Sequence, residues 1–267
     1  MTNILVLIHD DPGQEARLRA ALDLARALGG RLTCLDVAVA RVFPGDGMGG
    51  DAGVMMLDYE CKAEAANKAR LVPRLAAQSV PWDWIDTSGL LEASVEEAAA
   101  NCDLIVVSRH SDSFPAPDVD RAVAALIVKS GKPILAVPDS SAGLDLAGDG
   151  LVAWDGSPAV FAALEAAVPL LRLARSVTLL QIDDGSVRAP ASDAEACLRR
   201  HGIAASISRR PASLERTSVA ILAAAQTGDY AYLVMGGYSH GRVVEALFGG
   251  VTRRLLKESP IPLFLAH

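Results

Sequence analysis

Residues 234–256, VMGGYSHGRVVEALFGGVTRRLL, form the segment best suited to chemistry. An apolar run leads into Gly236 and Gly237, and the residues that follow have the spacing of an amphipathic helix. Glycines allow positive φ and close backbone approach, and the N–H groups of such a turn, with the start of the next helix, form an anion site. Thr252 would add a hydroxyl group. We therefore expect a phosphate-binding loop at the carboxyl end of a parallel strand, where open α/β sheets bind ligands.

A second candidate segment is Trp154-Asp155-Gly156-Ser157, which follows another apolar run. An aspartate there can accept hydrogen bonds from a ribose hydroxyl or an adenine amino group, and Gly156 would leave the entrance open. The same residues, placed before a proline, also suit a helix N-cap. The spacing leaves both roles open, with Ser157 favoured as the cap and Asp155 as the ligand contact. Ile182, which ends a predicted strand, is assigned to the same site.

The elements that must position these residues alternate between strands and helices. In the first part of the chain the strands have continuous apolar runs, which are typical of parallel strands covered by helices on both faces. A glycine-rich loop is expected at residues 41–53. The predicted strands are 4–8, 31–39, 82–86, 103–108 and 133–137, and the predicted helices are 14–28, 55–78, 91–100 and 118–130.

The same order of elements then starts again, which indicates an internal repeat. CDLIVVS at 102–108 parallels YAYLVMG at 230–236, and KPILAV at 132–137 parallels IPLFLA at 261–266. The second series begins with LVAWDGS at 151–157; its predicted helices are 158–173, 190–201, 213–226 and 242–257, and its further strands are 176–182, 204–209, 230–235 and 262–266. We predict two tandem open-sheet, Rossmann-like α/β domains, 1–139 and 151–267, joined by a linker at 140–150. Each would hold a five-stranded, mainly parallel sheet with helices on both faces.

Composition excludes several classes of function. The formal net charge is −7 and the basic residues form no run longer than a doublet, so nucleic-acid binding is not expected. The four cysteines are widely separated, and we predict no metal site and no disulfide framework. No apolar stretch is long enough to span a membrane, and the N-terminus does not resemble a signal peptide. We therefore expect a cytoplasmic protein.

The strand–aspartate–helix opening, the glycine loop and the closing proline-flanked strand resemble the universal stress protein family, in two copies. In its nucleotide-binding members the loop reads Gly, two residues, Gly, nine residues, Gly, then Ser or Thr. Here Gly236 and Gly249 match the first and third glycines, Ser239 replaces the second, and Gly250 replaces the hydroxyl residue. The resemblance implies an adenine-nucleotide α-hydrolase-like fold that binds ATP or another adenine nucleotide. The expected contact residues are Asp155, Gly156, Ser157, Ile182, Gly236, Gly237, Ser239, Gly249, Gly250, Val251 and Thr252.

The corresponding segment of the first half, residues 108–129, contains no glycine. It carries carboxylates, which repel a polyphosphate, and prolines, which lack a backbone donor. Asp10 and Asp11 follow the first strand, and without a phosphate loop we interpret them as turn and cap residues. We predict that the N-terminal half binds no triphosphate and serves as a packing partner or a regulatory domain.

Three functions remain open from the sequence. The first is a nucleotide-responsive stress protein that acts through conformation or assembly with an unidentified protein partner. The second is an ATP-hydrolysing or transferring enzyme of the same fold group, for which Arg242 and Arg253 are the only nearby cations. The third is a ligand-free scaffold for protein interactions. The resemblance also suggests that the two halves form an intramolecular pseudo-dimer through the strands 133–137 and 262–266, and it leaves open whether whole chains form a homodimer.

Overall fold

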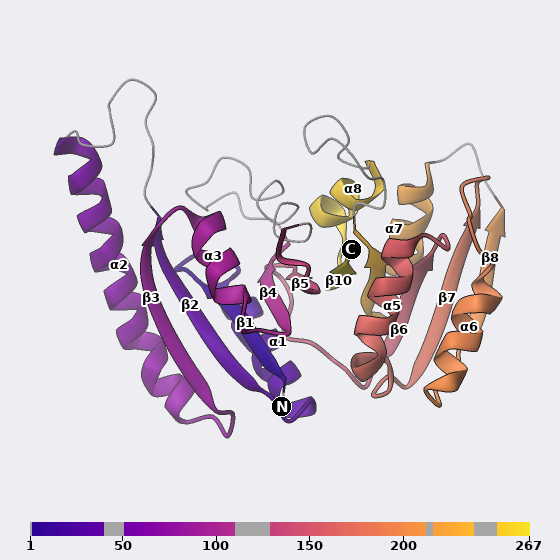
Figure 1. Ribbon diagram of the computed structural model, residues 1–267, viewed down its shortest axis with the longest axis horizontal. Coiled ribbons are helices and arrows are strands. Elements are labelled where there is room, and N and C mark those ends of the chain that lie inside the picture. The colour runs from indigo at the N-terminus through magenta and orange to yellow at the C-terminus, as the bar shows by residue number, and fades with distance from the viewer. Residues whose placement is uncertain (1, 40–50, 110–128, 212–215, 238–249) are drawn as a thin grey trace.

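The computed structural model describes residues 2–39, 51–109, 129–211, 216–237 and 250–267. Within these ranges ten strands form a single sheet in the order β3-β2-β1-β4-β5-β10-β9-β6-β7-β8 (Figure 1). We call the part that contains β1–β5 the N-terminal half and the part that contains β6–β10 the C-terminal half. The α/β class predicted from the sequence is confirmed.

The N-terminal half follows the predicted alternation of strands and helices. All its neighbouring strands are parallel, with β1 between β2 and β4. The predicted helix at 118–130 falls almost entirely outside the described residues. The elements are β1 (Asn3–Ile8), α1 (Gln14–Ala27), β2 (Arg31–Val39), α2 (Asp51–Ala76), β3 (Trp82–Gly89), α3 (Leu91–Ala99), β4 (Leu104–Ser108) and β5 (Ile134–Val137).

The C-terminal half repeats this arrangement, with β6 between β7 and β9. β6 begins at Asp149, so the end of the predicted linker 140–150 is part of a strand. β8 lies two residues later than the predicted strand 204–209, because its mostly exposed residues give no readable burial pattern. The elements are β6 (Asp149–Trp154), α5 (Pro158–Leu171), β7 (Ser176–Asp183), α6 (Ala191–Arg200), β8 (Ser206–Pro211), α7 (Thr217–Thr227), β9 (Tyr230–Gly236), α8 (Gly250–Glu258) and β10 (Leu263–Ala266).

The last strands of the two halves join the sheet. β5 and β10 pair antiparallel, with Leu135 opposite Phe264 and Ile134 opposite Leu265. These four side chains are at most 1% exposed. Because each strand would otherwise end its own half of the sheet, the pairing leaves β3 and β8 as the two edges of the whole sheet.

Two apolar layers cover the faces of the sheet. One layer contains buried residues of α1, α2, α5 and α6, and the other contains buried residues of α3, α7 and α8. Along β1, Ile4, Val6 and Ile8 belong to the first layer, whereas Leu5 and Leu7 belong to the second. This alternation explains the continuous apolar run, because successive side chains of a strand point to opposite faces.

Candidate nucleotide site and its N-terminal counterpart

The turn after β6 starts the candidate site of the C-terminal half. Ser157 is the N-cap of α5: its hydroxyl oxygen accepts a hydrogen bond from the N–H of Val160 at 3.3 Å, and Pro158 occupies the first helical turn. Asp155 Oδ1 accepts a hydrogen bond from the N–H of Ser157 at 2.8 Å. The prediction that Ser157 caps the helix is therefore confirmed. The second carboxylate oxygen of Asp155 accepts no hydrogen bond that the described part of the chain provides.

Both the backbone conformation and the close neighbours at position 156 require a glycine. Its φ is +69°, a conformation that side chains with a Cβ adopt only with strain. A Cβ at this position would also lie 2.1 Å from the backbone nitrogen of Ala189. The segment before α6 therefore packs directly on this glycine, and the N–H of Arg188 donates to the carbonyl oxygen of Asp155 at 2.7 Å.

The end of β9 lies against the first turn of α5. A Cβ on Gly236 would lie 2.6 Å from the backbone nitrogen of Val160 and 2.9 Å from the carbonyl carbon of Ala159. Only glycine permits this approach, which places the end of β9 beside the helix that follows the Asp155 turn. β6 and β9 are parallel neighbours, so their carboxyl ends share one edge of the sheet.

Free backbone donors were expected in the glycine turn, and for Gly237 that expectation is wrong. Its N–H donates to the carbonyl oxygen of Ala266 at 2.8 Å, and its own oxygen lies 2.9 Å from Nδ1 of His267. The N–H of Gly237 thus continues the β9–β10 ladder. Ser239 and Gly249 fall outside the described residues.

The remaining predicted site residues lie on β7 and α8. Ile182 is buried near the carboxyl end of β7, which neighbours β6. Gly250 opens α8, and a Cβ there would meet nothing within 4 Å. Val251 is half-buried, and Thr252 is only 6% exposed. Asp155, Ile182 and Gly236 therefore share one sheet edge, whereas burial limits what the Thr252 hydroxyl can offer to a ligand.

One further carboxylate lies at this edge. Burial acts to raise the pKa of Asp184, but hydrogen bonds from Ser186 and Thr217 outweigh burial and keep the pKa below its usual value. Asp184 is thus an ionised and already hydrogen-bonded carboxylate immediately after β7. It adds negative charge at the carboxyl end of β7.

In the N-terminal half, Arg17 lies at the carboxyl ends of β1 and β4, the strands that correspond to β6 and β9. This residue was not predicted from the sequence. Its side chain is 1% exposed, and its guanidinium group makes a bidentate ion pair with Asp11, with two N···O distances of 2.9 Å. It also donates to the carbonyl oxygens of Leu7 and His9 and to the hydroxyl of Ser108. Arg17 therefore joins the ends of β1 and β4. The strand order of this half reverses between these two neighbours, which makes their carboxyl ends the topological switch point, the place where open α/β sheets bind ligands.

In each half, the start of the first helix lies close to the end of a neighbouring strand. In the N-terminal half, a Cβ on Gly13, the N-cap of α1, would lie 2.4 Å from the Ser108 hydroxyl oxygen. In the C-terminal half, Gly236 makes the close approach, to Ala159 and Val160. Counting four residues onward from the N-cap of each helix places Phe161 at the position of Arg17, and α5 contains no arginine.

Asp11 and Arg17 were detectable in the sequence only in part. Asp11 was predicted to be a turn residue, and its Oδ1 indeed accepts a hydrogen bond from the N–H of Gly13 at 2.8 Å. Arg17 precedes Ala21 by one helical turn and so lies on the predicted apolar stripe of the helix. An arginine on that stripe was the sign in the sequence that this charged residue is buried.

The family of the chain follows from comparison with known proteins. A model of the universal stress protein family matches residues 1–138. The chain belongs to the universal stress protein family. The match covers the half in which Arg17 fills the switch point, and not the half that carries the glycine-rich segment.

Solved structures extend the likeness to the whole chain at the level of fold. A universal stress protein from Archaeoglobus fulgidus has a TM-score of 0.72 and 18% identity, covering 99% of this chain and 95% of that one. A functionally unknown protein, PA1789, from Pseudomonas aeruginosa has a TM-score of 0.65 and 17% identity, covering 100% and 92%. A putative universal stress protein from another Pseudomonas aeruginosa strain has a TM-score of 0.64 and 18% identity, covering 100% and 93%. No curated protein matches the chain.

Within the described residues, no helix is long and apolar enough to cross a membrane. In the same residues, no group of three or more His, Cys, Asp or Glu side chains could hold a metal ion.

Proposed function

We propose that this universal stress protein binds one adenine nucleotide, ATP in the first instance, in its C-terminal half. Binding would act through the conformation or assembly of the protein. The supporting observation is the contrast between the two switch points. Arg17 and Ser108 bridge the ends of β1 and β4, whereas α5 contains no arginine and β9 ends in Gly236.

The residues around the C-terminal switch point suit the nucleoside part of such a ligand. Asp155 uses one carboxylate oxygen for its own turn and has the other to accept a hydrogen bond from a ribose hydroxyl or an adenine amino group. Ile182 supplies apolar surface on the neighbouring strand. The phosphates would lie on the segment between Gly237 and α8, where the sequence resembles the family's loop and the helix start favours an anion.

Direct analysis of bound nucleotide tests the proposal first. Freshly purified protein is denatured, and the released small molecules are identified by chromatography and mass spectrometry. Calorimetric titration of the emptied protein with ATP then gives affinity and stoichiometry. We expect one nucleotide per chain, because the N-terminal switch point is filled by Arg17. Two per chain would contradict this account, and an empty protein that does not bind added ATP would leave the scaffold function instead.

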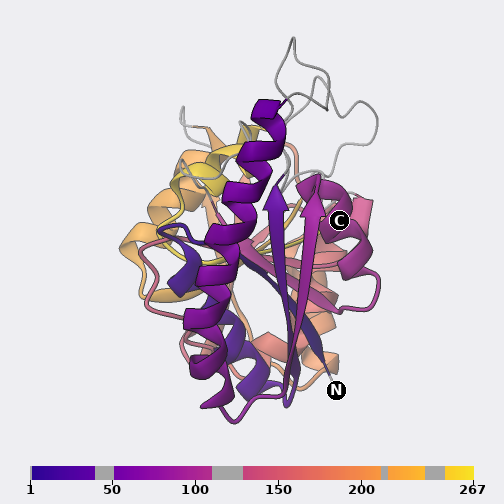
Figure 2. The same cartoon turned by 90° about the vertical axis from the view of Figure 1, so that its left-hand side faces the viewer.

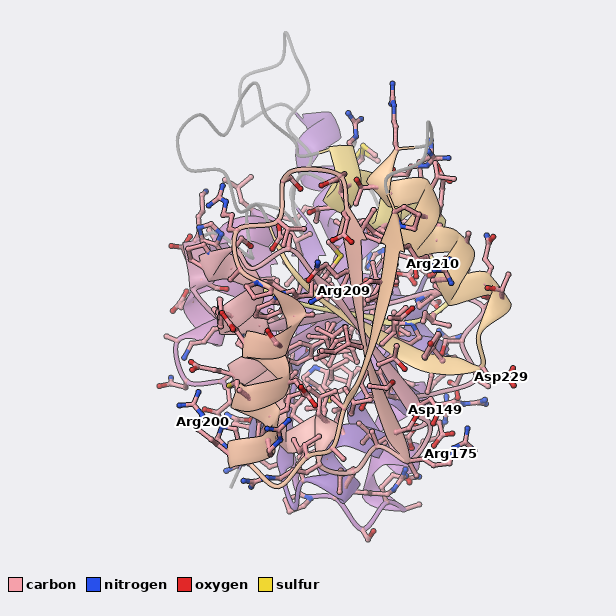
Figure 3. All side chains as sticks on the ribbon, turned by 90° about the vertical axis from the view of Figure 1, so that its right-hand side faces the viewer. Asp149, Arg175, Arg200, Arg209, Arg210 and Asp229 are labelled. Atoms are coloured by element: carbon pink, nitrogen blue, oxygen red, sulfur yellow. The ribbon has the colours of Figure 1, made fainter. Side chains whose placement is uncertain are left out.

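A conservative variant tests the role of Asp155. Asp155→Asn keeps an oxygen for the N–H of Ser157 but replaces the second acceptor oxygen with a donor. A hydrogen bond to a charged group contributes about 1.5–3 kcal/mol, so ATP affinity should fall roughly 10- to 100-fold. Asp229→Asn is the matched control. Asp229 is exposed just before the amino end of β9, at the end of the strands away from Asp155, and lies near Asp149 and Arg175 (Figure 3). Equal affinity of the Asp155→Asn variant and the wild type would exclude this role.

A further inference from the structure

Three titratable side chains meet beneath α2 in the N-terminal half, and none belongs to the proposed nucleotide site. His9 follows β1, Asp36 lies near the end of β2, and Glu64 lies in the middle of α2. They are 9%, 3% and 4% exposed, respectively. Figure 2 shows α2 running lengthwise beside β2 and β3, so this cluster lies between the helix and the sheet.

Glu64 is the centre of the cluster. Its Oε1 makes a hydrogen bond with Nδ1 of His9, and its Oε2 accepts a weaker one from Nδ2 of Asn67 at 3.4 Å. Asn67 is fully buried and exchanges two side-chain hydrogen bonds with Gln14, at 2.7 and 2.9 Å. His9 and Gln14, from the β1–α1 region, are thus tied to α2 through Glu64 and Asn67.

Asp36 completes the cluster only if it carries a proton. Both its oxygens are buried, and the described residues provide neither of them with a hydrogen-bond donor. Its carboxyl group nevertheless faces that of Glu64 closely enough for a hydrogen bond between them. Two buried carboxylates that face each other cannot both be ionised, because each would lose its hydration and be repelled by the other. A proton on Asp36, donated to Glu64, satisfies both groups.

The surrounding charges favour this protonation state. Burial raises the pKa of Asp36 to about 8, and the negative charges of Glu64 and Asp86 act in the same direction. His9 opposes them. Burial alone would lower the pKa of His9, but Glu64 and Asp11 raise it above its usual value, while Arg17 acts against them.

The remaining charged and titratable neighbours do not replace the proton. Lys68 of α2 pairs with Asp86 of β3, at the exposed margin of the cluster. Arg17 of α1 pairs with Asp11. Cys34 of β2 has its pKa raised to about 12 by burial and by Asp36, so it stays a neutral thiol.

We infer that His9, Glu64 and Asp36 form a proton-linked latch that holds α2 against the carboxyl ends of β1 and β2 and loosens as the shared proton is lost. Asp36 has a higher pKa in the folded protein than in the unfolded chain, so its contribution to stability is complete in acid and is lost as pH rises toward 8. His9 acts in the same direction, because its pKa is also raised by folding. The docking of α2 therefore weakens as the pH rises from acidic values to about 8.

Hydrogen exchange in the full-length protein measures this directly. The protection of the α2 amides, corrected for intrinsic exchange, should fall as pH rises from 6 to 8. The fall is at most about tenfold per pH unit for each proton that opening releases. Asp36→Asn should remove the proton contributed by Asp36 and flatten this dependence, since an amide can donate to Glu64 at every pH. Asp58→Asn is the matched control, because Asp58 is an exposed α2 residue paired with Lys62, and it should keep the wild-type dependence.

Two results would overturn the latch. One is an Asp36→Asn variant whose α2 protection keeps the full wild-type dependence on pH. The other is independent of any variant: infrared spectra of the wild type should show a protonated carboxylic acid at pH 7 that disappears by about pH 9, and absence of that band at pH 7 would show that Asp36 and Glu64 share no proton. Because the infrared test needs no substitution, it decides the question even if Asp36→Asn does not fold.

Discussion

Replacement of Arg17 by methionine should destabilise the N-terminal half severely. The side chains of Arg17 and Asp11 are 1% and 0% exposed. Among the described residues, the substitution leaves this buried carboxylate with the N–H of Gly13 as its one hydrogen-bond donor. Removing one member of a buried ion pair costs about 3–5 kcal/mol, because the remaining charge is uncompensated. At about 2–4 °C for each kcal/mol, the melting temperature should fall by roughly 6–20 °C.

Urea unfolding followed by circular dichroism measures the loss, and two further variants make the test specific. Arg19→Met is the control: Arg19 lies on the same helix but is 54% exposed and paired with Glu15, so its loss should cost about 0.5 kcal/mol or less. The double variant Arg17→Met/Asp11→Asn should recover part of the lost stability, because no buried charge is then left unpaired. A cost below about 1 kcal/mol for Arg17→Met, or additive losses in the double variant, would refute the reasoning.

The remaining predictions concern one glycine and one contact between the halves. Gly156→Ala should cost well over the 1–2 kcal/mol expected for Gly185→Ala in urea unfolding: both glycines have positive φ, but only at Gly156 would the new Cβ meet backbone, that of Ala189. Parity of the two variants would show that the turn relaxes. Arg109→Ala should speed hydrogen exchange in the last turn of α8, because Arg109 Nη1 donates to the carbonyl oxygen of Leu256 at 2.9 Å. Unchanged exchange there would show that the contact holds nothing in place.

The order of strands and helices was predictable because most strands are buried on both faces. β1 and β4 are continuous apolar runs, and such runs need no partner to be recognised. β8 was displaced in the prediction because an edge strand with exposed residues has no comparable pattern. The capping role of Ser157 was also predictable, since it depends only on residues close by in the sequence.

The buried charges were not predictable from local sequence. Arg17 reaches Ser108, which lies 91 residues away, and His9 reaches Glu64 across 55 residues. Burial of a charged group is acceptable only when such distant partners satisfy it, so the sequence around each residue carries little of the information. Asp36, one acid inside an apolar strand, was a visible anomaly, but its proton-sharing partner lies on another element.

The antiparallel pairing of β5 and β10 also has a genetic consequence. In a symmetric dimer of identical subunits, every substitution appears twice, so a residue that closes one switch point closes both. Here the equivalent contact joins two unequal stretches of one polypeptide, and each stretch can change alone. Arg17 can thus fill the first switch point while α5, the equivalent helix of the other half, contains no arginine. Covalent linkage allows division of labour between two copies of one fold.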